Sequence, residues 1–211
     1  MSLTFQVTTV HLPIPDQYVG TWGSGFVAHP KQPTVVLSLP RGASPLPWAT
    51  IDVATGTVRT GKGLRGELRD GLAAGDEALC LTTHAICRLR LFPEPEVVAT
   101  YRPKGLGTYL WRLLDFGPDF VAATGWASKS ALVLSRSDGT AVKRIAAVAP
   151  QSSVRIDDRI IRLFALHGGE VVDVDLKTLK TIERHRVPDG TRAVVADGEV
   201  FTLLARTKTC R

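Results

Sequence analysis

The segment EVVDVDLKTLKTIERHRV, residues 170–187, alternates apolar and polar residues, is interrupted at Lys177-Thr178 and then alternates again. Alternation with a period of two residues is typical of a β-strand with one buried face. The pattern therefore predicts a β-hairpin, in which the first strand ends at Val174-Asp175 and the second begins at Ile182.

The hairpin pattern recurs along the chain. The segment ATIDVATGTVRTG places Asp52 before a turn, in the same way as the segment around Asp175. The apolar runs that precede the hairpins start 43, 42, 40 and 40 residues apart, at Val35, Ala78, Phe120, Ile160 and Val200. A repeat of about 40 residues that holds four short strands indicates the blade of a β-propeller.

We therefore predict an all-β fold, a five-bladed β-propeller with four antiparallel strands per blade, in one domain over residues 1–211. The closing blade is shared between the ends of the chain, because TRAVVADG and EVFTLLAR supply two strands and residues 3–22 supply the other two. Such closure removes exposed sheet edges. No long period of 3.6 residues appears, so LGTYLWRLLDF is interpreted as a strand.

The Asp-x-x-Thr-Gly hairpin that begins at Asp52, echoed at Asp175, resembles the repeat of quinoprotein-like and YVTN-type propellers. The resemblance spans the chain as a repeat pattern. It implies a fold and no activity, so the function has to be argued from other residues.

The composition is that of a packed protein with an excess of positive charge. Hydrophobic residues make up 44% and charged residues 22%, and the net charge is +6. No run reaches the roughly 18 apolar residues of a membrane span, and no secretory signal pattern is seen, so no membrane association is expected. Three cysteines do not form a secreted disulfide framework, which predicts a cytoplasmic protein.

Two motifs suggest chemistry, but structural explanations are favoured. GKGLRG at residues 61–66 has the letters of a dinucleotide fingerprint, yet the next segment has a strand pattern rather than a helix pattern. Cys80, His84 and Cys87 could hold a metal or form a disulfide, but zinc needs a fourth ligand. With a turn at Thr83-His84, the two cysteines should lie directly opposite each other. We predict no cofactor, no metal and no catalytic residue.

The charges separate between the two ends of the predicted blades. With strands lettered a to d from the centre outward, the d-to-a and b-to-c connections share one end, called the top face. Its assigned loops carry nine positive residues against three negative ones, and the opposite turns are mainly acidic. Such a surface attracts anions. The predicted binding residues are Lys62, Arg65, Lys104, Lys129, Arg192 and Arg206, with Trp126 available for stacking.

The leading hypothesis is a non-enzymatic binding or scaffolding propeller that engages an acidic protein segment or another anionic ligand, with no nucleic-acid partner expected. One alternative is a small hydrolase or lyase with its site at the central pore, which needs two catalytic groups within hydrogen-bond reach. The other is a carbohydrate-binding lectin, which repeated identical pockets would favour.

Overall fold

The structure is a computed structural model, and it describes residues 26–28, 34–38, 46–52, 54–74, 77–106, 110–125, 128–188, 191–197 and 200–205. Over these residues the regular structure consists of strands and one short 3-10 helix. They contain no helix of the length and apolar character that crossing a membrane requires. The chain divides into two compact units, Met1–Thr100 and Tyr101–Arg211.

The first unit contains two successive sets of four strands. The first set is β1 (Phe26–Ala28), β2 (Thr34–Ser38), β3 (Leu46–Asp52) and β4 (Val58–Leu64), and the second is β5 (Leu68–Ala74), β6 (Glu77–Thr82), β7 (Ile86–Arg90) and β8 (Glu96–Tyr101). A single parallel bridge between Lys62 of β4 and Glu96 of β8 joins the two sets into one sheet of order β1-β2-β3-β4-β8-β7-β6-β5. The sequence pattern did not predict this bridge.

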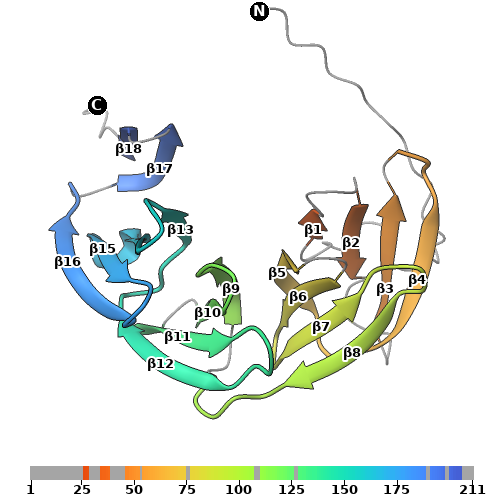
Figure 1. The fold of residues 1–211 in the computed structure, drawn as a ribbon. Coiled ribbons are helices and arrows are strands. Elements are labelled where there is room, and N and C mark those ends of the chain that lie inside the picture. Colours follow the sequence, from red (N-terminus) through yellow and green to blue (C-terminus); the bar gives the residue numbers. More distant parts are fainter. Residues whose placement is uncertain are drawn as a thin grey trace, which may run out of the picture. The chain divides into compact units, whose positions relative to one another are not determined.

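The second unit contains two separate four-stranded sheets and a strand pair (Figure 1). The first sheet holds β9 (Leu110–Asp115), β10 (Phe120–Gly125), β11 (Ser130–Ser135) and β12 (Ala141–Ala146) in sequential order. The second holds β13 (Ser152–Arg155), β14 (Ile160–Ala165), β15 (Glu170–Asp175) and β16 (Lys180–Arg186), with the short helix η2 (Leu166–Gly168) before β15. The pair is β17 (Thr191–Asp197) and β18 (Val200–Ala205).

The predicted repeat of four antiparallel strands is confirmed for these sets. The segment LGTYLWRLLDF contains strand β9, as its pattern predicted. The two strands that were predicted to complete a fifth blade, in residues 3–22, lie outside the described residues.

The hairpin predicted for residues 170–187 is confirmed as β15 and β16. The second strand begins at Lys180 rather than at Ile182, because Lys180 already pairs with Asp175. The Asp175 Oδ1 atom accepts hydrogen bonds from the backbone N–H and the hydroxyl of Thr178, at 2.7 and 3.1 Å. The Asp52 Oδ1 atom accepts hydrogen bonds from the backbone N–H groups of Ala54 and Thr55, at 2.9 and 3.2 Å. Aspartate recurs before these turns because its side chain satisfies the turn backbone.

The outer strands of the two sheets in the second unit share an irregularity. Val142 of β12 and Ile182 of β16 are each an extra residue in the pairing with the neighbouring strand, which makes each a β-bulge. Their side chains are 48% and 53% exposed. The bulges occupy the same place after the hairpin turn, so the repeat extends to details of the register.

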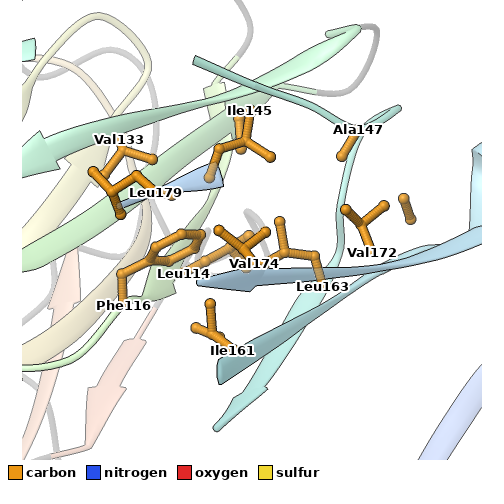
Figure 2. Close-up of a cluster of buried hydrophobic side chains, with 13 residues drawn as sticks. Leu114, Phe116, Val133, Ile145, Ala147, Ile161, Leu163, Val172, Val174 and Leu179 are labelled. Carbon is orange, nitrogen blue, oxygen red and sulfur yellow. The ribbon is translucent and has the colours of Figure 1, made fainter. Parts of the chain in front are cut away.

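The main core cluster of the second unit is largely aliphatic and contains the buried ring of Phe116. Phe116 packs with Leu114, Val133, Leu163 and Val174, and Figure 2 shows these side chains gathered between the sheets. Alternate residues of β14 and β15 belong to this cluster, because successive side chains of a strand point to opposite faces of the sheet.

The core of the first unit is built around Trp48. Its side chain is fully buried, and its Nε1–H donates to the Lys62 carbonyl at 3.2 Å. The same cluster contains Leu64, Leu68 and Leu89. Trp48 therefore serves as apolar packing.

Candidate anion-binding site

The predicted binding residues divide between the two units. Lys62 and Arg65 belong to the first unit, and Lys104 and Lys129 belong to the second; all four side chains are exposed. Arg192 lies in β17, but its side chain is outside the described part of the structure, as are Trp126 and Arg206.

The assignment of Lys62 to a loop was wrong. Lys62 lies within β4, where its backbone bridges to Glu96 of β8. The side chain of Glu96 in turn forms an ion pair with Arg90. Arg65 lies two residues before Glu67, which forms an ion pair with Arg69 at 2.6 Å. Lys62 and Arg65 therefore each have an acidic residue nearby in the sheet pairing or in the sequence, which weakens their attraction for an anion.

In the second unit, Lys104 stands on a tight turn over residues 103–106. The Leu106 N–H donates to the Pro103 carbonyl at 3.0 Å, and Gly105 has a φ of +85°. These are features of a type II turn, in which the third residue needs a positive φ, and Lys104 is the exposed second residue. The turn holds the Lys104 side chain in solvent.

Lys129 stands on the connection between β10 and β11. The hydroxyl of the preceding Ser128 donates to the carbonyl of the following Ser130 at 2.8 Å, and it also hydrogen bonds to the Thr124 hydroxyl at 3.1 Å. These bonds fix the backbone on both sides of Lys129, so its position is set by the loop and not by its own side chain.

Arg144 of β12 joins the two loops. Its Nη2 atom donates to the Gly105 carbonyl at 2.6 Å, and its Nη1 atom donates to the Ser130 hydroxyl at 3.3 Å. One guanidinium thus ties the residue after Lys104 to the residue after Lys129. We call Lys104, Lys129 and Arg144 the basic corner.

Within the described residues, the cations of the basic corner form no ion pairs. All three side chains are exposed. Among the residues that the structure describes, no carboxylate forms an ion pair with any of them; the ion pairs of the second unit involve other arginines and one histidine. Because Arg144 holds the loops that carry Lys104 and Lys129, an anion that binds both lysines has to order their side chains but not the loops.

Sequence reasoning did not identify Arg144 as a functional residue. The available signal was the repeat, because Arg184 occupies the equivalent position of the next repeat. Arg184 also makes two contacts, one from Nη1 to Glu170 at 2.8 Å and one from Nη2 to the Ala146 carbonyl at 2.6 Å. We call this recurring contact, from a β12 or β16 arginine to a backbone carbonyl of the preceding segment, the arginine clamp.

The cysteines lie as the sequence predicted. Cys80 and Cys87 are directly opposite each other in β6 and β7, and both are buried. Burial, with the neighbouring Cys87 and Asp70, raises the pKa of the Cys80 thiol far above its usual range. Among the described residues, no three His, Cys, Asp or Glu side chains come together as a metal site would require.

Among the described residues, the arrangement most similar to an acid–base pair involves His185. Its Nε2 atom lies 3.6 Å from Asp173 and 3.7 Å from Glu183, which is beyond hydrogen-bond length. Asp173 is instead held by two bonds from Arg162, at 2.7 and 2.6 Å. Burial opposes ionisation of Asp173, but these bonds prevail and lower its pKa. His84 is exposed on the turn after β6, and the side chain of His167 lies outside the described residues.

Comparisons with known proteins show a fold and no family. No protein-family model matches the sequence, and no curated protein matches it. Solved structures with similar folds include the WD40 domain of Toxoplasma gondii coronin (11% identity, TM-score 0.61, 81% of this chain) and hydrazine synthase of Kuenenia stuttgartiensis (13%, 0.68, 99%). A third is a proposed 6-phosphogluconolactonase of Bacteroides uniformis (15%, 0.65, 88%).

The chain spans 47%, 62% and 65% of the lengths of the coronin, hydrazine synthase and Bacteroides chains, respectively. At these identities the likeness concerns the fold alone. The protein therefore has an all-β fold of the WD40-like, β-propeller type.

Proposed function

We propose that the protein is a non-enzymatic binding module whose basic corner engages an acidic segment of another protein. The observation that supports this most directly is Arg144, which links the loops that carry Lys104 and Lys129. Because exposed ion pairs each contribute only about 0.2 to 1 kcal/mol, recognition requires several carboxylates acting together. An acidic segment supplies them on one flexible chain.

The proposal includes five blades, the last built from β17, β18 and residues 3–22. It rests on the repeat period and on the two strands that follow β16. In this arrangement Arg192 and Arg206, with Trp126 as a stacking surface, extend the binding surface of the second unit. Removal of residues 1–19 should abolish cooperative thermal unfolding, and an unchanged melting curve would count against a shared blade.

The binding proposal is tested with fluorescein-labelled poly-L-glutamate, followed by fluorescence anisotropy. The double variant Lys104→Glu/Lys129→Glu should bind about tenfold more weakly or worse, since two attractions become repulsions. Binding by the natural protein should also weaken as salt rises, because ions screen exposed charges over roughly 8 Å at physiological strength.

Lys62→Glu/Arg65→Glu is the matched control, because it changes the net charge by the same amount. Its effect should be smaller, since Lys62 pairs through its backbone with the acidic Glu96 and Arg65 lies two residues before Glu67. Equal losses in the two double variants would mean that net charge alone governs binding. That result, or unchanged binding by the Lys104→Glu/Lys129→Glu protein, would reject the basic corner as a site.

A further inference from the structure

The outer strand β16 has one paired edge and one open edge. It is the last strand in the order β13-β14-β15-β16, and β15 pairs along one side of it. No other described strand pairs with β16. An open edge presents backbone N–H and C=O groups that can accept a further strand.

The side chains of β16 are open to solvent along most of its length. Lys180 to Arg184 are all exposed, and so is Arg186. Ile182, at 53%, is the most exposed large hydrophobic side chain among the described residues. An apolar β-branched residue in the middle of an open edge offers a contact to an incoming strand.

Two cations stand at the ends of this edge. Lys180 is the first residue of β16 and Arg186 is the last, about 20 Å apart at roughly 3.3 Å per residue. Neither side chain forms an ion pair within the described residues, whereas Arg184 is engaged by Glu170 and the Ala146 carbonyl. The only carboxylate on the strand is Glu183.

The charges of Lys180 and Arg186 favour an acidic partner strand over a second copy of this chain. If two copies paired antiparallel about Glu183, Lys180 of each copy would face Arg186 of the other. Like charges placed opposite each other destabilise a strand pair, so a second copy is disfavoured. A partner strand with carboxylates opposite Lys180 and Arg186 makes an attractive contact at each position instead of a repulsive one.

We infer that β16 binds an extended acidic segment of a partner protein by strand addition along its open edge. The segment carries acidic residues near both ends and an apolar residue that covers Ile182. Backbone hydrogen bonds supply affinity, and Lys180, Arg186 and Ile182 supply selectivity. This site is separate from the basic corner and does not depend on it.

The strand is held in place before any partner binds. Arg184 anchors it to Glu170 and to the Ala146 carbonyl, and the turn before it is fixed by Asp175 and Thr178. A preformed edge lowers the cost of ordering on binding.

The test uses a fluorescein-labelled peptide of about eight residues that contains only glutamate, valine and threonine, a length that matches β16. A second peptide of the same sequence carries N-methyl groups on alternate backbone amides, so it keeps the charges but cannot complete a ladder. The full chain should bind the first peptide and lose measurable binding to the second. Hydrogen exchange should show new protection at residues 180–186.

Protein variants provide the complementary readout. Lys180→Glu/Arg186→Glu should weaken binding of the unmethylated peptide by about tenfold or more, and Ile182→Ser should weaken it severalfold. Lys104→Glu/Lys129→Glu, which removes the basic corner, should leave the new protection at residues 180–186 intact. Equal binding of the methylated peptide, protection elsewhere than in β16, or no binding at all would overturn the inference.

Discussion

The indole of Trp48 occupies the space that a Cβ atom on Gly61 would need. Trp48 lies in β3 and pairs with Gly61 in β4, where both residues are buried. A side chain at residue 61 would overlap the Cε2, Cζ2 and Nε1 atoms of the ring. The glycine in this strand is therefore explained by close packing rather than by its backbone angles.

Gly61→Ala should destabilise the first unit by about 1 to 3 kcal/mol, the usual cost of overpacking a core. The measurement is the midpoint of urea unfolding. In a Trp48→Leu background the indole ring is absent, so Gly61→Ala should lower the free energy of unfolding by much less. Equal costs in both backgrounds would show that Trp48 is not the obstacle.

Gly105→Ala should weaken the basic corner without altering any charge. An added Cβ would overlap the Nη2 atom of Arg144, and it would also sit at a φ of +85°. Gly117→Ala is the matched control, because Gly117 has a φ of +92° and nothing within 4 Å of the added atom. Both variants should lose about 1 to 2 kcal/mol of stability from the backbone.

Only Gly105→Ala should reduce poly-L-glutamate binding, measured by fluorescence anisotropy under conditions where both proteins are folded. A loss of binding of the same size in Gly117→Ala would assign the effect to general destabilisation. Unchanged binding by the Gly105→Ala protein would show that poly-L-glutamate binding does not depend on the position of the Arg144 guanidinium.

Asp175 should make unfolding sensitive to acid. A hydrogen bond from Arg159 at 2.7 Å and the backbone N–H of Thr178 lower its pKa from 3.8 to about 2, although burial opposes the shift. A carboxyl whose pKa is lower in the folded state stabilises the fold above its unfolded pKa, and this stabilisation is lost as pH falls through the folded value. The affected window runs from 3.8 down to about 2.

Asp175→Asn should therefore lower the urea midpoint at neutral pH and flatten its dependence on pH within that window. Arg159→Gln removes the largest cause of the lowered Asp175 pKa, so it should reduce the pH dependence of the urea midpoint in part. If the natural protein and Asp175→Asn lost stability in parallel between pH 3.8 and about 2, the assignment to Asp175 would be wrong.

Cys80 and Cys87 should not react with Ellman's reagent in the folded protein. Both are buried, and the raised pKa of Cys80 leaves little thiolate to attack. In a Cys210→Ser background, two thiols should titrate after unfolding in urea. Fewer than two would indicate a disulfide, and zinc recovered in proportion to protein would contradict the prediction that no metal is bound.

The hairpins could be predicted because local chemistry determines them. Asp52 and Asp175 cap their turns with their own carboxylates, so the signal lies within a few residues of the turn. The position of Lys62 could not be predicted in this way, since the parallel bridge to Glu96 joins residues that are distant in sequence. Two of the three residues of the basic corner, Lys104 and Lys129, had a local signal as lysines in predicted loops, but the role of Arg144 depends on its contacts with Gly105 and Ser130.

The arginine clamp has a consequence for how this chain could grow or shrink by duplication. Each clamp needs a donor within one repeat and a backbone carbonyl within the preceding segment: Arg144 uses Gly105, and Arg184 uses Ala146. The acceptors are main-chain atoms, which every residue possesses. A gene segment that encodes one whole repeat therefore carries both halves of the contact, and an inserted copy would be joined to its neighbours without any compensating substitution.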